Sequence, residues 1–359
     1  MSELEEFVQI SRFAGQRFDL VQAGGGNSSV KLGDGSLLIK ASGFALSEVG
    51  PGVGNVRLNN AKIVAILRDP LGLGGGKEER DVRSQALLRA AQVEPGPKPS
   101  IETFLHALLY RHTLHTHPLV VNAITCRPDW ESILIGLFPE ALCVKYQTPG
   151  IELALELQLQ LAHADPEGTR PLPNLVFLQN HGLIVSYDDP DEVIRRTEEV
   201  LVRLEAFLKV DMKAHKHVTA LSRHLETLTR EPLIVFRSRD RELARLAKLA
   251  APEWLQGQFC PDGFVFGGYR TVRLGSTDDL SPIDRYYTEF KKPPKVLLLD
   301  GEVYLVSSSL RKAREVEDVF SFHLQVLELA GPMVNYLSGE ELQYLATWES
   351  EKYREKLHT

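Results

Sequence analysis

The spacing of apolar residues predicts alternating helices and strands over the first two thirds of the chain. Two short apolar runs separated by Gly33-Asp34-Gly35 have the pattern of a β-hairpin. Residues 59–68 fit either a strand or a helix, and 71–77 is a glycine-rich loop. Strands are predicted at 29–32, 36–40, 114–125 and, interrupted by a polar turn, 174–185. Helical spacing covers 3–20, 80–92, 100–110, 151–163 and one long stretch from 191 to about 229.

The last third of the chain repeats this pattern on a smaller scale. Strands are predicted near 263–267 and 295–306, and the second run turns at Asp300-Gly301. Helices are predicted near 240–250, 310–330 and 338–356. Because strands alternate with helices in both parts, we predict an α/β fold with a domain over 1–230 and a C-terminal α/β extension over 231–359.

Composition narrows the class of protein. The chain has 359 residues, 43% of them hydrophobic and 25% charged, which is typical of a globular protein. Its net charge of -7 argues against nucleic acid as a partner, since nucleic-acid binding needs an excess of Lys and Arg. The N-terminus lacks the pattern of a secretory signal, and no apolar run is long enough to span a membrane. Cys126, Cys143 and Cys260 are far apart, so we expect free thiols and a cytoplasmic protein.

Three histidines form the strongest chemical signal. His115 and His117 flank one residue of a predicted strand, which places both imidazoles on the same face. His181 lies in a polar turn at the end of another predicted strand. Three histidines with an open fourth position are the usual arrangement of a catalytic zinc site. A His-x-His pair alone is more often a pair of hydrogen-bonded histidines, so the third histidine is what favours a metal site.

A glycine-rich turn at 24–29 precedes a short strand. Glycines allow successive N–H groups to face one ligand, and Asn27, Ser28 and Ser29 add side-chain donors. A phosphate or another oxyanion is the ligand that such a turn suits. A tight turn between a helix and a hairpin explains the same residues equally well.

Glu102 lies four residues before His106, on one face of a predicted helix. A carboxylate beside a divalent cation can take a proton from a carbon acid whose carbonyl oxygen binds that cation. Considered alone, Glu102 is explained by the helix dipole, and His106 is explained by a hydrogen bond in the core.

These signals occur together, in an order that resembles the class II aldolase/adducin family. The matching segments are GGGNSSV at 24–30, LLIKASG at 37–43, PSIET at 99–103 followed by HTHP at 115–118, and LQNHGLIV at 178–185. A closer likeness, over about residues 5–356, is to the aldolase part of bifunctional rhamnulose-1-phosphate aldolase/lactaldehyde dehydrogenase proteins. It includes TPGIELALELQ at 148–158 and the tail from Leu337. The dehydrogenase part has no counterpart in this chain, so we expect no NAD chemistry.

The resemblance implies a class II aldolase-like α/β/α three-layer domain and a homo-oligomer, namely a tetramer. It implies that zinc, or another divalent cation, is held by three histidines and that Glu102 transfers the proton. The implied metal ligands are His115, His117 and His181. A sugar phosphate is implied to bind Gly26, Asn27, Ser42, Gly43 and Ser100, with Lys40 in a segment that lines the same site.

The implied reaction is cleavage of a ketose 1-phosphate, resembling rhamnulose 1-phosphate, to dihydroxyacetone phosphate and a short aldehyde. The same metal site is also compatible with the other activities of the family, namely those of sugar-phosphate 4-epimerases, dehydratases and decarboxylases. A further alternative is a non-catalytic adducin-like interaction module. Ile101 replaces a second serine of many simple members and removes one phosphate donor. Glu152, near the place where some rhamnulose-phosphate aldolases add a glutamate, is either a fourth metal ligand or a plain helix N-terminal residue. Retention of all three histidines and Glu102 favours an enzyme.

Overall fold

The computed structural model describes residues 2–167 and 169–347, which form two compact units. The first unit ends at Met212 and the second begins at Lys213. The boundary expected from the sequence, between 230 and 231, falls after helix α9 (Lys213–Thr229) instead of before it. This helix packs against strand β8 (Ile234–Arg237), which explains why it groups with the second unit.

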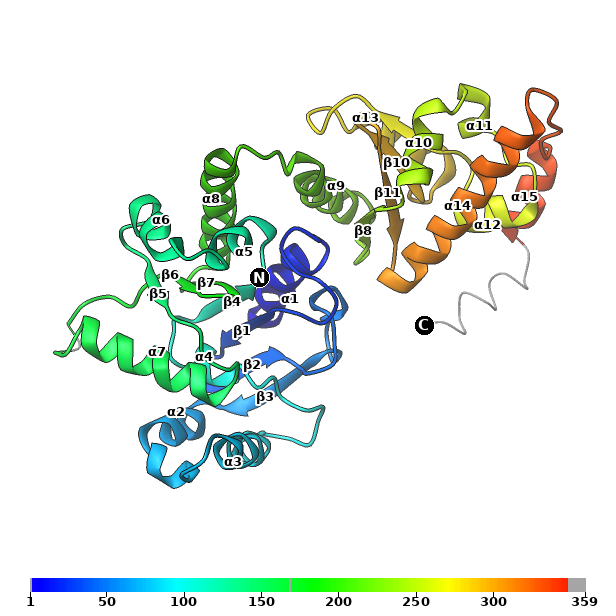
Figure 1. The fold of residues 1–359 in the computed structure, drawn as a ribbon. Helices are drawn as coiled ribbons and strands as arrows, with labels where there is room; N and C mark the ends of the chain where they lie inside the picture. Colours follow the sequence, from blue (N-terminus) through cyan, green and yellow to red (C-terminus); the bar gives the residue numbers. More distant parts are fainter. Residues whose placement is uncertain (1, 168, 348–359) are drawn as a thin grey trace. The chain divides into compact units, whose positions relative to one another are not determined.

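The first unit is built on a seven-stranded sheet with the order β3-β2-β1-β4-β7-β6-β5 (Figure 1). Only the pair β5 and β6 is parallel. The predicted hairpin is confirmed in β1 and β2, and β6 and β7 form a second hairpin around the turn that contains His181. The strands are β1 (Asn27–Lys31), β2 (Ser36–Lys40), β3 (Asn55–Asn59), β4 (His112–Thr116), β5 (Leu142–Val144), β6 (Leu175–Leu178) and β7 (Gly182–Tyr187).

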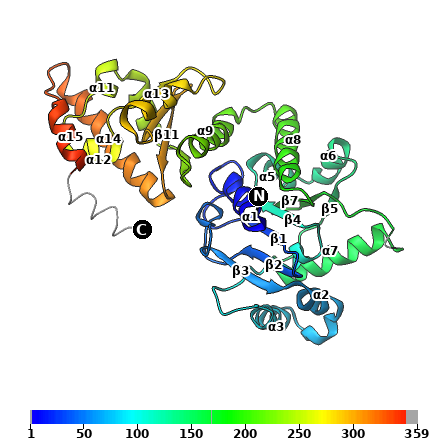
Figure 2. The same cartoon turned by 180° about the vertical axis from the view of Figure 1, so that it is seen from behind.

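Helices cover both faces of this sheet (Figures 1 and 2). Side chains alternate across a strand, so Leu183 enters one core and its neighbour Ile184 enters the other. The first core contains α1 (Glu3–Gly15), α5 (Leu119–Thr125), α6 (Trp130–Leu137) and α8 (Pro190–Leu208). The second contains α2 (Asn60–Arg68), α3 (Lys77–Ala90), α4 (Thr103–Ala107) and α7 (Ile151–Ala164). The expected α/β/α three-layer fold is therefore confirmed.

Two predictions from hydrophobic periodicity in this unit are wrong. The strand expected over 114–125 ends at Thr116, and α5 begins after Pro118. Proline lacks the N–H that a central strand needs, and an apolar run of this length suits a buried helix as well as a strand. The long helix expected from 191 to 229 is two helices, because Lys209 adopts a left-handed conformation with φ 56° and ends α8.

The structure also differs from the sequence-based prediction at the ends of shorter elements. The segment 59–68, which fitted a strand or a helix, ends β3 and then forms α2. The helix expected over 100–110 is only α4, and the glycine-rich loop begins with a short 3-10 helix, η2 (Pro70–Leu73). Periodicity identifies the existence of such elements better than their ends.

The second unit has a four-stranded sheet with the order β8-β11-β10-β9, also between two helical layers. Tyr304 and Leu305, adjacent on one strand, enter its two different cores. One core contains α9 and α13 (Ser281–Phe290), and the other contains α10 (Arg241–Leu249) and α14 (Leu310–Ala330). The remaining strands are β9 (Val272–Leu274), β10 (Val296–Leu299) and β11 (Glu302–Ser307). The expected C-terminal α/β extension is thus confirmed.

The strand expected at 263–267 is wrong. This segment is helix α12 (Pro261–Gly267), in which Cys260 is the N-cap and Pro261 occupies the first turn. Proline in the first turn favours a helix start. Helices α11 (Pro252–Gln256) and α15 (Gly339–Thr347) complete the unit. Residues 348–356 of the predicted last helix lie outside the described residues.

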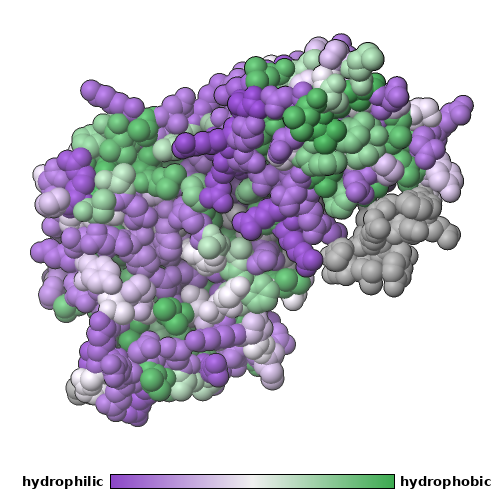
Figure 3. Space-filling model, turned by 45° about the vertical axis from the view of Figure 1, so that its right-hand side comes forward, coloured by the Kyte–Doolittle hydropathy of each residue, from purple (hydrophilic) through white to green (hydrophobic). Residues whose placement is uncertain are grey.

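The face that Figure 3 presents is mainly hydrophilic, with separate hydrophobic patches. Large exposed apolar side chains of the second unit include Phe322, Leu329, Met333 and Tyr344. Among the described residues, no helix has both the length and the apolar character needed to cross a membrane.

Candidate active site

The candidate site lies at the ends of the central strands of the large sheet, where strands from distant parts of the sequence begin or end. β1 begins at Asn27 and pairs with β4 so that Asn27 lies opposite His115. His117 follows the last residue of β4, and His181 precedes the first residue of β7, which pairs with β4 on its other side. Strand pairing therefore brings these four residues to the same end of the strands.

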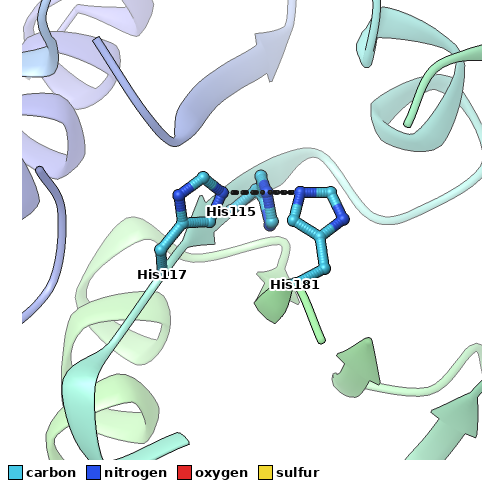
Figure 4. Close-up of side chains that lie close together, drawn as sticks. All are labelled: His115, His117 and His181. Carbon is cyan, nitrogen blue, oxygen red and sulfur yellow. Dashed lines mark hydrogen bonds between the residues drawn. The ribbon is translucent and has the colours of Figure 1, made fainter. Parts of the chain in front are cut away.

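The three predicted histidines converge on one point (Figure 4). The Nε2 atom of His115 lies 3.0 Å from that of His117 and 3.3 Å from that of His181. Their ligand nitrogens all lie within 4.8 Å of one another. Nitrogen atoms so arranged can share a single cation, which is the arrangement that the His-x-His spacing predicted.

The surroundings of His115 and His117 favour the neutral, metal-binding form of these two imidazoles. His115 Nδ1 lies 3.1 Å from the carbonyl oxygen of Leu183 and donates to it, which directs the lone pair of Nε2 toward the other histidines. Burial lowers the pKa of His115 well below its ordinary value. Burial also lowers the pKa of His117, and the charge of His181 adds to the effect. A neutral imidazole is what a divalent metal binds.

Glu102 lies directly against two of the three histidines. Its Oε1 atom is 3.2 Å from His181 Nε2 and 3.7 Å from His115 Nε2, and its Oε2 atom accepts a hydrogen bond from Asn27 Nδ2. Burial raises the pKa of Glu102 and is the largest single effect, but the interactions with His115, His181 and His106 together outweigh it, so the pKa is lowered and the carboxylate is ionised at neutral pH.

Two oxygen atoms at the site are buried and accept no hydrogen bond from a residue that the structure describes. They are Oε1 of Glu102 and Oδ1 of Asn27. Buried acceptors without a donor are costly, and a cation beside them removes that cost. These oxygens and the three convergent imidazoles therefore fit a divalent metal.

The glycine-rich turn packs closely against the metal-binding histidines. A Cβ atom on Gly26, whose φ is 71°, would lie 2.8 Å from the carbonyl oxygen of His115. A Cβ atom on Gly25 would lie 2.9 Å from His117 Nδ1. Only glycine allows the backbone to approach so closely and to adopt positive φ without strain, so the turn is shaped by the site and is not merely a connection.

The other residues expected to bind a phosphate lie on two adjacent loops. The N–H of Ser42 donates to the carbonyl oxygen of Lys98 at 2.8 Å, and Ala41 forms a β-bridge with Pro99. The loop with Ser42 and Gly43 therefore runs beside the loop with Ser100. Lys40, the last residue of β2, is buried behind the first of these loops.

Glu152 is not part of the histidine group. It lies in the first turn of α7, and its two carboxylate oxygens accept hydrogen bonds from Arg80 at 2.7 and 3.1 Å. The structure therefore places this candidate ligand in an ion pair between α3 and α7. His106 is a buried core histidine whose Nδ1 atom lies 2.7 Å from Ser29 Oγ, as one reading of the sequence expected.

Two contacts of the site have no sequence signal. The contact between Asn27 and Glu102 joins residues of different segments, and the acceptor for His115 Nδ1 is a backbone oxygen, which any residue at that position supplies. The spacing of residues along the sequence cannot identify either contact, because both contacts depend on the register of the paired strands.

Comparison with known proteins gives one family match and several similar proteins. The family described as the Class II Aldolase and Adducin N-terminal domain matches residues 5–208, which include the whole candidate site. The uncharacterized oxidoreductase YuxG of Bacillus subtilis is 25% identical over 224 residues, or 59% of this chain. This chain spans 30% of the length of that curated relative.

Two solved structures are also similar. The N-terminal class II aldolase domain of a conserved Thermoplasma acidophilum protein is 27% identical, with a TM-score of 0.48, and the match covers 58% of this chain and 94% of that one. A sugar-phosphate aldolase from Thermotoga maritima is 18% identical, with a TM-score of 0.40, over 58% and 94% of the two chains. Since the family match extends over more than half of the sequence, the chain belongs to the class II aldolase and adducin N-terminal domain family.

Proposed function

We propose that this protein is a divalent-metal-dependent aldolase. It cleaves a ketose 1-phosphate, resembling rhamnulose 1-phosphate, to dihydroxyacetone phosphate and a short aldehyde. The observation that carries the proposal is the position of the Glu102 carboxylate, 3.2 Å from one of three convergent imidazoles. An ionised carboxylate is costly to bury, and a buried carboxylate beside three convergent imidazoles is typical of catalysis.

His115, His117 and His181 would hold the cation, and zinc suits three histidines with an open position. The bound cation would act as a Lewis acid toward the carbonyl oxygen of the ketose. Glu102 moves the proton. When the C3–C4 bond of the ketose breaks, C4 becomes the aldehyde carbon, and the Glu102 carboxylate takes up the proton that the C4 hydroxyl loses. Glu102 then delivers this proton to C3, and in the condensation direction its carboxylate removes the proton from C3 and the new C4 oxygen takes it up. Asn27 holds Oε2, which leaves Oε1 available for the proton transfer.

The phosphate end of the substrate is held by the two loops beside the metal ligands. The backbone around Gly26 and Gly43 offers N–H groups, and Asn27, Ser42 and Ser100 offer side-chain donors. An anchored phosphate keeps the C3–C4 bond in register with Glu102, which lowers the entropic part of the barrier.

The test combines metal content with product analysis. The wild-type protein is expected to bind about one zinc ion per chain, and His117→Ala is expected to lose it. Glu102→Gln is expected to keep the zinc and to lower the cleavage rate at least about 100-fold. Two small fragments are the expected products. An isomer would instead indicate an epimerase, carbon dioxide a decarboxylase, and a wild-type protein that takes up no metal would contradict the proposal.

A further inference from the structure

Alternate residues of β1 hold the segment that carries Glu102. Side chains alternate across a strand, so Asn27, Ser29 and Lys31 share one face of β1. Each of them bonds the segment 102–109, which contains helix α4, and their partners follow one another in the same order along that segment. Asn27 bonds Glu102 itself, whereas the other two bond the helix that follows it.

The contact of Ser29 is made with the middle of the helix. Ser29 Oγ lies 2.7 Å from His106 Nδ1, and both side chains are buried. Burial lowers the pKa of His106 to about 4, so its ring is neutral at neutral pH. A hydrogen bond is directional, whereas apolar packing is not. This bond therefore fixes where α4 lies along the strand.

The contacts of Lys31 are made with the end of the helix. Its Nζ atom donates to the carbonyl oxygen of Ala107, the last residue of α4, at 3.0 Å, and also to that of Leu109. Carbonyl oxygens at the C-terminus of a helix have no partner within the helix, and a cation is favourable there. Burial lowers the pKa of Lys31 to about 8, although the charge of Asp188 opposes this effect. The amine is thus kept under the helix end at a cost in desolvation.

The position of Glu102 depends on these contacts because Glu102 is the residue directly before α4. This helix has five residues, which is too short for a helix to be stable by itself. Its place is therefore set by the elements around it. A shift of about 1 Å in a reacting group can lower a rate about 100-fold, so contacts that hold α4 bear on the proton transfer.

We propose that Ser29 and Lys31 are positioning residues for proton transfer by Glu102, because they hold α4 in place against β1. Ser29 acts through His106, and Lys31 acts through the carbonyl oxygens at the helix end. This inference rests on the proposed function for the reaction that Glu102 serves. It also gives Ser29 a role other than that of an oxyanion donor, since its hydroxyl bonds the helix.

The test compares Ser29→Ala and Lys31→Met with Ser11→Ala, each as the zinc-loaded full chain. Ser11 is the matched control, because it is buried and bonds Ser28 at 2.6 Å on the opposite face of β1. With rhamnulose 1-phosphate, kcat should fall at least about tenfold in the first two variants while KM changes less than about twofold, since only the proton-transferring group is displaced. Ser11→Ala should keep both constants. Zinc content and the thermal midpoint establish that each variant is loaded and folded, and the two test variants address the same helix independently.

A second readout needs no substrate. Cobalt(II) bound in place of zinc absorbs visible light, and its bands respond to the groups around the ion. Oε1 of Glu102 is buried 3.2 Å from His181 Nε2, so Glu102→Gln should shift these bands. Ser29→Ala and Lys31→Met should shift them in the same direction, and Ser11→Ala should not.

The outcomes separate the two proposals. A folded, loaded variant with the kcat or the cobalt spectrum of the wild type would overturn the role of the residue that it replaces. An equal loss of kcat in Ser11→Ala would overturn both roles, as would identical spectra of the wild type and Glu102→Gln. A wild type that does not cleave rhamnulose 1-phosphate would reject the aldolase proposal, and the cobalt spectra would then decide whether Ser29 and Lys31 position Glu102.

Discussion

The side-chain amide of Asn27 donates a hydrogen bond to Oε2 of Glu102, across 75 positions of sequence. Asn27 lies opposite His115 in the sheet, and Glu102 is the residue before α4. The carboxylate is therefore held by an amide on one oxygen and faces His181 and His115 with the other. Its orientation is set by residues of three separate segments.

Replacement of Asn27 by alanine should impair turnover without loss of metal. The hydrogen bond goes to a charged acceptor, so its loss is expected to lower kcat by about 10- to 100-fold. Zinc content and kcat are measured on the same preparations. Ser28→Ala is the control, since Ser28 bonds Ser11 and does not touch Glu102. An unchanged kcat in Asn27→Ala would show that Glu102 is oriented without the amide.

Adjacent glycines should differ sharply in their tolerance of a methyl group. A Cβ on Gly25 would lie 2.9 Å from His117 Nδ1, so Gly25→Ala must displace that imidazole. A Cβ on Gly24 would have its nearest neighbour, the oxygen of Phe44, at 3.8 Å. We expect zinc affinity, measured by competition with a chelator, to fall about tenfold in Gly25→Ala. Gly24→Ala should remain near the wild type, and equal losses in both would contradict this account.

His106 should make the protein less stable as the pH falls. Burial lowers its pKa from 6.5 to about 4, although the charge of Glu102 opposes this effect and that of Lys31 adds to it. Between pH 4 and pH 6.5, His106 binds a proton in the unfolded chain but not in the folded chain. The contribution of His106 to the free energy of unfolding is therefore constant above pH 6.5. As the pH falls from 6.5 to 4, the free energy of unfolding decreases by about 3 kcal/mol because of this residue.

The test is the pH dependence of denaturant unfolding in His106→Gln, in which this residue does not titrate. The slope of the unfolding free energy between pH 4 and 6.5 should be smaller than in the wild type by up to about 1.4 kcal/mol per pH unit. The difference between the two proteins is the relevant quantity, because other buried histidines titrate in both. Identical slopes would mean that His106 is protonated in the folded state.

Arg17 should be among the most sensitive positions for stability. Its side chain is fully buried and pairs with both oxygens of Asp19 and with Glu198 on α8. Arg17→Met removes the guanidinium that pairs with both oxygens of the buried Asp19 carboxylate, so we expect a loss of about 3–5 kcal/mol in chemical unfolding. Arg17→Met combined with Asp19→Asn should recover part of that loss. A change below about 1 kcal/mol in the single variant would contradict the prediction.

The sequence determined the elements whose signals are local. The hairpin of β1 and β2 follows from a glycine turn between two apolar runs, and the α/β class follows from strands alternating with helices, whereas the three-layer arrangement was implied only by the family resemblance. His115 and His117 were identified as neighbours because alternate residues of a strand share a face. The sequence also indicated His181 and Glu102, through their order in family motifs, but not the distances between them.

The tertiary structure decided what local patterns leave ambiguous. The apolar run 114–125 suits a strand or a helix. In the structure its first residues form β4, which pairs with β1 on one side and β7 on the other, and the residues after Pro118 form helix α5. The contact of Asn27 with Glu102, the backbone acceptor of His115 and the two carbonyl contacts of Lys31 all depend on how the strands pair and pack. Residue spacing records which side chains share one element. It does not record which elements become neighbours, because that is set by packing of the whole sheet.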